Sequence, residues 1–182
     1  MERGAVMIEP KNRLQGVLEL PAIDRVRRNH GLEHATLHVL SEHNPRLPLA
    51  GHSDAGGYWI LGELRTEEVA NAAQEALARL LAGEEKLAIH PNCGTNFAAA
   101  GIFAGLAAGL AMFGVGRKLR DNFERLPTAV MFATLALIFA QPLGLALQEH
   151  VTTSGKPGDL RVLEVQQRKQ GKLTIHRVVT GG

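Results

Sequence analysis

The sequence predicts an integral membrane protein in which a polar α+β body is joined to a hairpin of two transmembrane helices. Residues 97–116 and 127–147 contain no charged side chain. Each stretch has about the 20 residues that a helix needs to cross a bilayer, so both are predicted to span it. Amphipathic helical segments and short β-branched runs on both sides of these stretches predict the body.

Three segments are expected along the chain. Residues 1–96 form an N-terminal polar α+β segment, residues 97–147 form the transmembrane hairpin, and residues 148–182 form a C-terminal β-hairpin. Because the connection between the two apolar stretches is short, both polar segments should emerge on the same side of the membrane. We therefore expect the C-terminal β-hairpin to pack with the N-terminal segment in a single sheet.

Local patterns predict the elements of the body. Residues 24–42 have a helical pattern that Pro45 ends, and Thr66 caps a second helix that ends at Gly83. Residues 51–57, rich in Gly, Ser and Asp, separate two short apolar runs and predict a β-hairpin. Residues 160–165 and 173–179 predict a further hairpin that turns at Gln170 and Gly171.

Composition excludes some classes of protein. The 20 basic and 18 acidic residues give a net charge of +2 and form no basic stripe, so we expect no nucleic acid partner. Cys93 is the only cysteine, so no disulfide can form within the chain. Because Cys93 cannot form a disulfide within the chain, a different role has to be sought for its thiol.

The N-terminal residues predict on which side of the membrane the polar body lies. Residues 1–10 lack the apolar run of a secretory signal, which predicts a multi-pass protein of the plasma membrane with a cytoplasmic body. The positive-inside rule favours the opposite, because the connection between the spans is basic. Its basic residues are Arg117, Lys118, Arg120 and Arg125. We give the missing export signal more weight.

The first apolar stretch carries glycines at every fourth position, at Gly101, Gly105 and Gly109. Such a ridge lets another helix backbone approach closely. The second span is the expected neighbour, and the same ridge is a candidate surface for a homo-oligomer.

A candidate metal site lies on the first predicted helix, where His30, Glu33 and His34 spell H-x-x-E-H. These spacings put the three side chains on one helix face, within reach of a common ion. In inverted zinc peptidases two such histidines hold the metal and the carboxylate activates water. The alternative is a solvated helix face, because a motif of this length also arises by chance.

A second cluster, His90 to Asn96, directly precedes the first span and brings His90 and Cys93. Two helical histidines with one further ligand would leave a fourth position open, as in catalytic zinc sites. Cys93 is the better third ligand, since it precedes a helix whose N-terminal dipole favours a thiolate. The alternative is that this segment only starts the helix. Zinc suits imidazole and thiolate ligands best.

At these two motifs the chain resembles the YqhQ-like membrane proteins, a family of predicted metal-dependent enzymes. Its H-G-x-E-H motif with a following Thr is matched by His30, Gly31, Glu33, His34 and Thr36. Its H-P-x-C-G-T-x-F motif is matched by His90, Pro91, Cys93, Gly94, Thr95 and Phe97. Later matches are Leu147, Gln148, Thr152, Thr153, Pro157, Asp159 and Glu164. The resemblance implies a metal-dependent membrane enzyme, although Ala35 and Leu40–Ser41 depart from the family pattern.

Three functions fit these residues. The first is a membrane-anchored zinc hydrolase, for example a protease, in which Glu33 is the general base and the substrate is a lipid or a membrane-protein segment. The second is a scaffold or assembly factor without activity, in which His30, His34, His90 and Cys93 close a structural metal site. The third makes Cys93 a nucleophile paired with a histidine and leaves Glu33 without a role.

Overall fold

The computed structural model describes residues 13–114, 116, 119–170 and 173–182. Residues 1–10, on which the predicted orientation rests, and Gly171 of the predicted turn lie outside this part of the chain. The elements in order are α1 (Arg13–Leu18), α2 (Pro21–His43), β1 (Ala50–Asp54), β2 (Gly57–Leu61), α3 (Thr66–Leu81), the 3₁₀ helix η1 (Glu85–Ala88), α4 (Gly94–Ala111), α5 (Leu119–Leu147), the π-helix η2 (Gln148–Thr152), β3 (Arg161–Gln170) and β4 (Leu173–Gly181).

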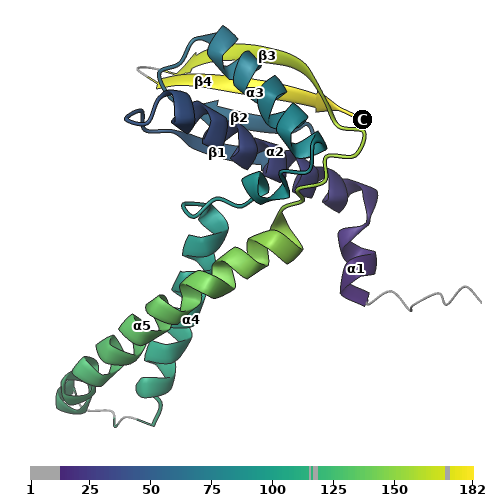
Figure 1. Ribbon diagram of the computed structural model, residues 1–182. Helices are drawn as coiled ribbons and strands as arrows, with labels where there is room; N and C mark the ends of the chain where they lie inside the picture. Colours follow the sequence, from purple (N-terminus) through teal and green to yellow (C-terminus); the bar gives the residue numbers. More distant parts are fainter. Residues whose placement is uncertain (1–12, 115, 117–118, 171–172) are drawn as a thin grey trace, which may run out of the picture.

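The body is a four-stranded antiparallel sheet with helices on one face, which confirms the α+β prediction. The strand order is β1-β2-β4-β3, so the C-terminal strand β4 lies between β2 and β3. Helices α2 and α3 pack together over the sheet (Figure 1). The N-terminal and C-terminal segments therefore build one sheet and share one core.

The core lies between the helices and the sheet. Tyr58 and Ile60 of β2 are fully buried against the helix layer, together with Leu32 and Val39 of α2 and Val69 of α3. The opposite face of the sheet is more open: the guanidinium of Arg177 lies 4.8 Å from the Trp59 ring centroid. This division into one buried and one solvated face is usual for antiparallel sheets.

Strand β1 corrects the prediction that residues 51–57 only separate two apolar strands. That glycine-rich segment itself contains β1 and the turn after Asp54. Pairing with β2 makes this segment a strand. A Cβ on Gly51 would overlap the side chain of Glu33, which packs against the strand from α2. Glycine here permits close contact between helix and strand.

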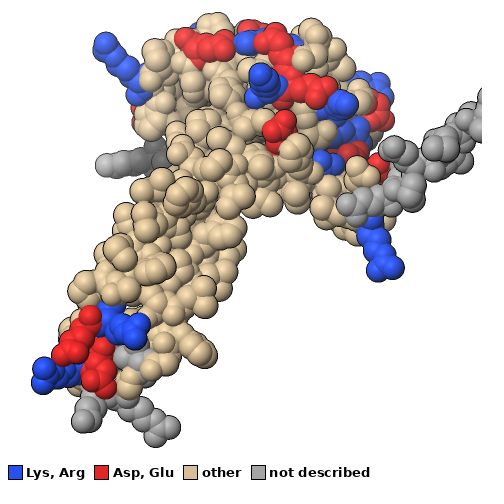
Figure 2. All heavy atoms as spheres, turned by 60° about the horizontal axis from the view of Figure 1, so that its bottom comes forward, with Lys and Arg blue, Asp and Glu red and all other residues tan. Residues whose placement is uncertain are grey.

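Helices α4 and α5 form an arm that extends from the body (Figure 1). Both are long and apolar enough to cross a membrane. Figure 2 shows that Lys, Arg, Asp and Glu gather on the body and at the far tip of the arm, while the surface between them carries none. Large apolar side chains on this surface are open to the outside, including Phe97, Leu110 and Ile138.

Small residues form the contact between the two arm helices. Ala99 of α4 and Ala129, Ala140 and Gly144 of α5 are buried. A Cβ on Gly144 would lie 2.6 Å from the Asn96 side-chain oxygen, so glycine lets α4 approach closely. The arm is thus held by close packing of short side chains, as is common in membrane helix pairs.

The ridge of Gly101, Gly105 and Gly109 does not form this contact, so that expectation was wrong. A Cβ at any of the three glycines would meet no described atom within 4 Å. The helix presents its alanine face to α5 instead, and the glycines lie on an open face. Their predicted role in a homo-oligomer stays a prediction.

The predicted bounds of the spans also differ from the helices. Helix α4 begins at Gly94 rather than residue 97, because Cys93 already caps it. Helix α5 begins at Leu119, so Pro127 lies inside the helix rather than at its start. The charged residues before Pro127 continue the helix, supported by an Arg120–Glu124 ion pair of 2.8 Å one turn apart. The polar connection is therefore shorter than residues 117–126.

His176 of β4 is a fully buried imidazole, and neither ring nitrogen has a hydrogen-bond partner among the described residues. An unsatisfied buried polar group costs about 1–3 kcal/mol. We therefore expect His176→Leu to raise the free energy of unfolding by a similar amount. Thermal unfolding in mild detergent, followed by Trp59 fluorescence, measures the change. The exposed His43→Leu variant serves as control and should change stability little.

The same variant should also change the pH dependence of stability. Burial lowers the pKa of His176 in the folded protein from its ordinary value of 6.5. Below that pH the unfolded chain binds a proton that the folded chain does not, so the native protein loses stability as the pH falls. His176→Leu should remove this part of the loss. A variant less stable than the native protein at every pH would show that the ring is satisfied in the folded state.

Candidate metal centre

His30, Glu33 and His34 lie on one face of helix α2, as their spacings of three and four residues predict. Glu33 and His34 are buried and His30 is half-buried. Gly31 lies between them because residues 152–154 cross α2 at this point: a Cβ there would overlap the Ser154 carbonyl oxygen. The glycine of the motif is therefore required for packing rather than for chemistry.

Backbone carbonyls orient both histidines. His30 Nδ1 lies 2.9 Å from the Thr152 carbonyl oxygen, and His34 Nδ1 lies 2.7 Å from the Ala88 carbonyl oxygen. Since a carbonyl only accepts, each Nδ1 carries a proton, and in the neutral ring the lone pair therefore lies on Nε2. Burial lowers the pKa of His34, which favours the neutral ring that a metal requires.

Cys93 is the N-cap of α4, and its sulfur accepts a hydrogen bond from the Thr95 amide at 3.4 Å. Its Sγ also lies 3.4 Å from His30 Nε2. Burial raises the pKa of the Cys93 thiol, but hydrogen bonds with His34 and Thr95 outweigh burial and hold the pKa below its ordinary value. The position thus favours the thiolate, which is the form that binds metals.

These three residues form a group that can hold a metal ion. The ligand atoms of His30, His34 and Cys93 all lie within 4.8 Å of one another. In a tetrahedral site with bonds of about 2.0–2.3 Å the ligands lie about 3.5 Å apart, close to the separation of Cys93 Sγ from His30 Nε2. Two imidazoles whose Nδ1 atoms are held by backbone carbonyls, together with a thiol, are therefore a donor set that fits a metal.

Glu33 lies beside this group with one carboxylate oxygen unused. Its side chain packs against Gly51 and hydrogen-bonds with Ser53, both in β1. The other oxygen, Oε2, is buried and has no hydrogen-bond partner among the described residues. Burial raises the pKa of Glu33 to about 7, against the opposing effect of the His30 charge. A buried carboxyl oxygen without a partner is unusual, and a catalytic role or a bound water or ion would account for it.

His90 lies next to the group but is not part of it. Its ring centroid is 5.7 Å from that of His34 and 4.9 Å from that of His38. His90 Nδ1 accepts a hydrogen bond from the Asn92 amide at 3.2 Å, which leaves the ring proton on Nε2. The structure thus brings together three of the four predicted ligands, and a role for His90 as ligand stays a prediction.

A cavity of about 900 Å³ contains the group. Its polar lining includes His30, Glu33, His34 and Cys93, and β1 contributes Gly51 and its neighbours to the same wall. The rest of the wall is largely apolar and comes mainly from α1 and α2: Leu18, Ala22, Ile23, Val26 and Leu37, with Leu49 and Val151 from other segments. The candidate centre is therefore open to a molecule of moderate size.

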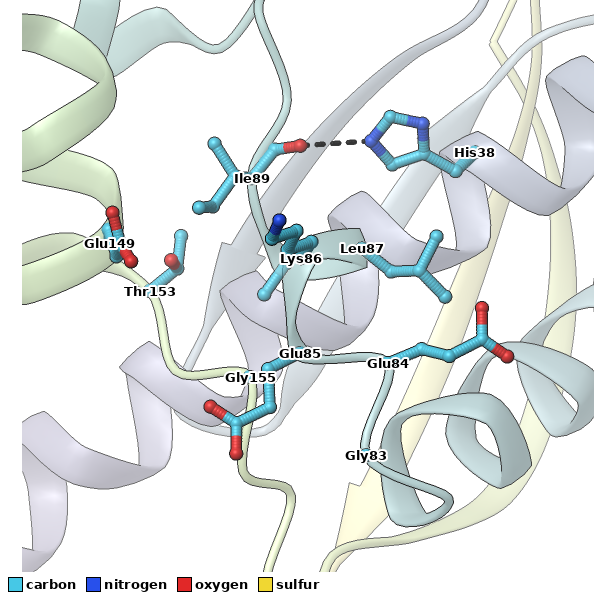
Figure 3. Close-up of a pocket in the computed structure, with 11 residues that line it drawn as sticks. His38, Gly83, Glu84, Glu85, Lys86, Leu87, Ile89, Glu149, Thr153 and Gly155 are labelled. Atoms are coloured by element: carbon cyan, nitrogen blue, oxygen red, sulfur yellow. Dashed lines mark hydrogen bonds between the residues drawn. The ribbon is translucent and has the colours of Figure 1, made fainter.

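A second cavity, of about 670 Å³, is lined by His38, the segment around η1 and Glu149 (Figure 3). The carboxylates of Glu84, Glu85 and Glu149 point in different directions, and no ligand group of three forms there among the described residues. His38 Nε2 donates to the Ile89 carbonyl oxygen at 2.9 Å. This side chain ties α2 to the segment that leads to His90, so its role is positional.

The contacts of several groups at the site were not apparent from the sequence, even where the residue itself matched the family pattern. The carbonyls of Ala88 and Thr152 are backbone atoms and leave no residue signal. Ser53 was attributed to turn chemistry but contacts Glu33. Gln148 is fully buried, accepts from the His90 amide at 2.9 Å and donates to Asn96 at 2.6 Å, which fixes the base of α5 against the second motif.

Comparisons with known proteins identify a family and one similar protein. An uncharacterized protein of Picosynechococcus sp. (strain ATCC 27264 / PCC 7002 / PR-6) is 34% identical over 155 residues, which cover 72% of this chain and 76% of that protein. No solved structure matches. Residues 25–165 match the model of a domain of unknown function, DUF6391, and this range includes both motifs. The match does not test the resemblance to YqhQ-like proteins. The chain belongs to the DUF6391 family.

Proposed function

We propose that the protein is a membrane-anchored, zinc-dependent hydrolase whose active site lies at the membrane surface. One observation carries the proposal: three metal-ligating side chains and the free carboxylate oxygen of Glu33 line one open cavity. A structural metal site would need a fourth protein ligand. His90 is outside the group, so a metal held by the three residues would have its fourth position left for water.

Exposure of the arm supports its insertion in the membrane. Phe97, Leu110 and Phe113 expose 68%, 75% and 84% of their surface. A continuous apolar surface of this extent is unfavourable in water and marks a surface that a membrane or another chain covers. Charges at the far tip and in the body flank the apolar region, as expected if the hairpin crosses the bilayer and the tip reaches the other side.

The insertion of the arm would also place the group of His30, His34 and Cys93 relative to the membrane. Cys93 caps α4, and Thr152, whose carbonyl orients His30, ends η2 directly after α5. Both arm helices thus enter the candidate site at their body ends. In a membrane-inserted protein the cavity would open at the bilayer surface, with the body on the cytoplasmic side as proposed from the sequence.

The residues have distinct roles in this proposal. His30, His34 and Cys93 would hold the zinc, which when bound lowers the pKa of water to about 7. Hydrogen bonds from Nδ1 of each histidine to a carbonyl would leave Nε2 as the ligand atom of each ring. Glu33 Oε2 would accept a proton from the attacking water and pass it to the leaving group.

Metal content tests the ligand set. The protein purified in mild detergent should contain about one zinc per chain, as a single catalytic site requires. The His30→Ala, His34→Ala double variant should contain none. A His43→Ala, His150→Ala double variant removes two histidines outside the group and should retain the metal. Equal content in all three proteins would refute the site.

Maleimide labelling of Cys93 tests the third ligand without any mutation, since it is the only thiol. Labelling should be slow in the purified protein, much faster after a strong chelator, and slow again when zinc is restored. This result would also exclude a metal-free Cys93 nucleophile. If chelator does not change the rate in protein shown to contain zinc, Cys93 is not a ligand.

A further inference from the structure

The outer edge of β1 is a row of backbone groups beside the candidate metal centre. β1 is the end strand of the sheet and, in the described part of the chain, pairs only with β2. The Thr180 amide donates to Gly56 O at 3.1 Å and the Gly62 amide to Thr174 O at 3.2 Å, so even-numbered residues of β2 bond toward β4. Hydrogen bonds alternate in an antiparallel ladder, so the odd-numbered residues of β2 bond toward β1.

The register then gives the direction of each β1 amide. Ala50, His52 and Asp54 lie opposite residues 61, 59 and 57, and so they bond to β2. Gly51 and Ser53 direct their N–H and C=O groups away from the sheet. No backbone hydrogen bond from another described segment reaches either residue. An unpaired edge of this kind is a template for an added strand.

This edge and the catalytic groups share one cavity. Gly51 and Ser53 line the cavity of about 900 Å³ that also contains His30 and Cys93. The Glu33 side chain packs directly against Gly51. A chain laid along the outer side of β1 would therefore pass over Glu33 and the metal ligands.

The chemistry of the walls decides between two occupants. A lipid acyl chain can fill the apolar wall around Ile23 and Val26, but it offers no partner to backbone N–H and C=O groups. An extended peptide offers one N–H and one C=O toward the edge at every second residue, and its alternating side chains can contact the apolar wall. The combination of an open strand edge and an apolar wall therefore fits a peptide better than a lipid.

We propose that the substrate is an extended polypeptide segment that binds as an added strand along Gly51 and Ser53 of β1. The proposal rests on the proposed hydrolase function and names its substrate class. The oxygen of water bonds to the peptide carbonyl carbon, the C–N bond breaks, and Glu33 transfers the proton from water to the leaving nitrogen. The products are a carboxylate and a free amine, and water is the only co-reactant.

The first experiment measures binding without turnover. The Glu33→Gln protein in mild detergent with zinc restored is titrated into fluorescein-labelled casein, an unfolded amphipathic polypeptide, and anisotropy is recorded. Ser53→Pro and Ser53→Ala are compared in this background. Both lose the Ser53 hydroxyl, but only proline also removes the outward N–H, and proline is tolerated on an edge strand in that position. Trp59 fluorescence and zinc content report whether each variant is folded.

We expect the casein dissociation constant to be about tenfold higher for Ser53→Pro than for Ser53→Ala. This is the change in affinity that follows when the Ser53 N–H can no longer donate a hydrogen bond to the bound peptide. Equal affinities would overturn the proposal. A fluorescent short-chain phosphatidylcholine should bind without distinguishing the two variants. If this lipid displaces casein while both variants bind casein equally, the cavity takes lipid and the proposal fails.

The second experiment leaves β1 unaltered and so does not depend on how proline is tolerated. The shortest casein fragment that competes for binding is synthesised with a single N-methyl group at each position in turn. Strand addition predicts that methylation weakens binding at every second residue, because only alternate N–H groups face β1. Binding that shows no such alternation would contradict the proposal.

These measurements separate the two ideas. Edge-dependent binding of casein that the native protein does not cleave would refute the hydrolase function and leave strand addition standing. Cleavage of casein by the native protein, with equal affinity in both Ser53 variants, would support hydrolysis and refute strand addition.

Discussion

Glu33→Gln is expected to abolish hydrolysis while the metal stays bound. The amide keeps the shape of the side chain but cannot accept a proton from water. General-base catalysis contributes about 10²–10⁴-fold to rate, so the variant should lose activity by at least the lower figure. The three ligands are separate side chains, so zinc content should equal that of the native protein. Casein cleavage and a fluorescent ester substrate provide the rates, and elemental analysis gives the metal.

Glu42→Gln is the matched control for this substitution. Glu42 lies on the same helix, is exposed, and pairs with Arg79 at 2.9 Å outside the cavity. The control removes the same charge and should retain full activity, because exposed ion pairs contribute little. Full activity in Glu33→Gln would show that Glu33 is not the base. Loss of zinc in that variant would show instead that Glu33 holds the site together.

Gly31→Ala is expected to destabilise the fold and to weaken metal binding together. The added Cβ would overlap the Ser154 carbonyl oxygen, and that segment is held to α2 by the Ser154 amide, which donates to Arg27 O at 3.0 Å. Overpacking of this kind costs about 1–3 kcal/mol. Displacing the segment also removes the Thr152 carbonyl from His30, and loss of such an orienting bond lowers metal affinity about 10–100-fold.

Thermal unfolding and competition with a calibrated zinc chelator measure the two effects of Gly31→Ala. Gly16→Ala is the control, because Gly16 lies in α1 and a Cβ there meets no described atom within 4 Å. Helix propensity alone should change its stability by about 1 kcal/mol or less. If Gly31→Ala behaves like the control in both measurements, the crossing segment does not orient His30.

The arm could be predicted from the sequence because its signal is local. Two stretches without charge and of sufficient length indicate apolar helices wherever they lie in the fold. The same holds for His30, Glu33 and His34, since helical spacing alone puts them on one face. Cys93 was chosen as their partner from its position before a helix, and the structure places its sulfur 3.4 Å from His30 Nε2. The mixed α+β class of the body was likewise predicted from local periodicity.

Tertiary structure alone decided the features that depend on contacts between distant segments. The tautomers of His30 and His34 depend on carbonyls of residues 152 and 88, which carry no side-chain signal. Pairing with β2 makes the glycine-rich segment the edge strand of the sheet, with Gly51 against Glu33, where the sequence pattern had predicted only a connection. In the arm, local spacing favoured the glycine ridge, but the three glycines lie on an open face of α4 and Ala99 is buried instead. Short-range pattern determines which residues share a face, whereas only packing decides what that face meets.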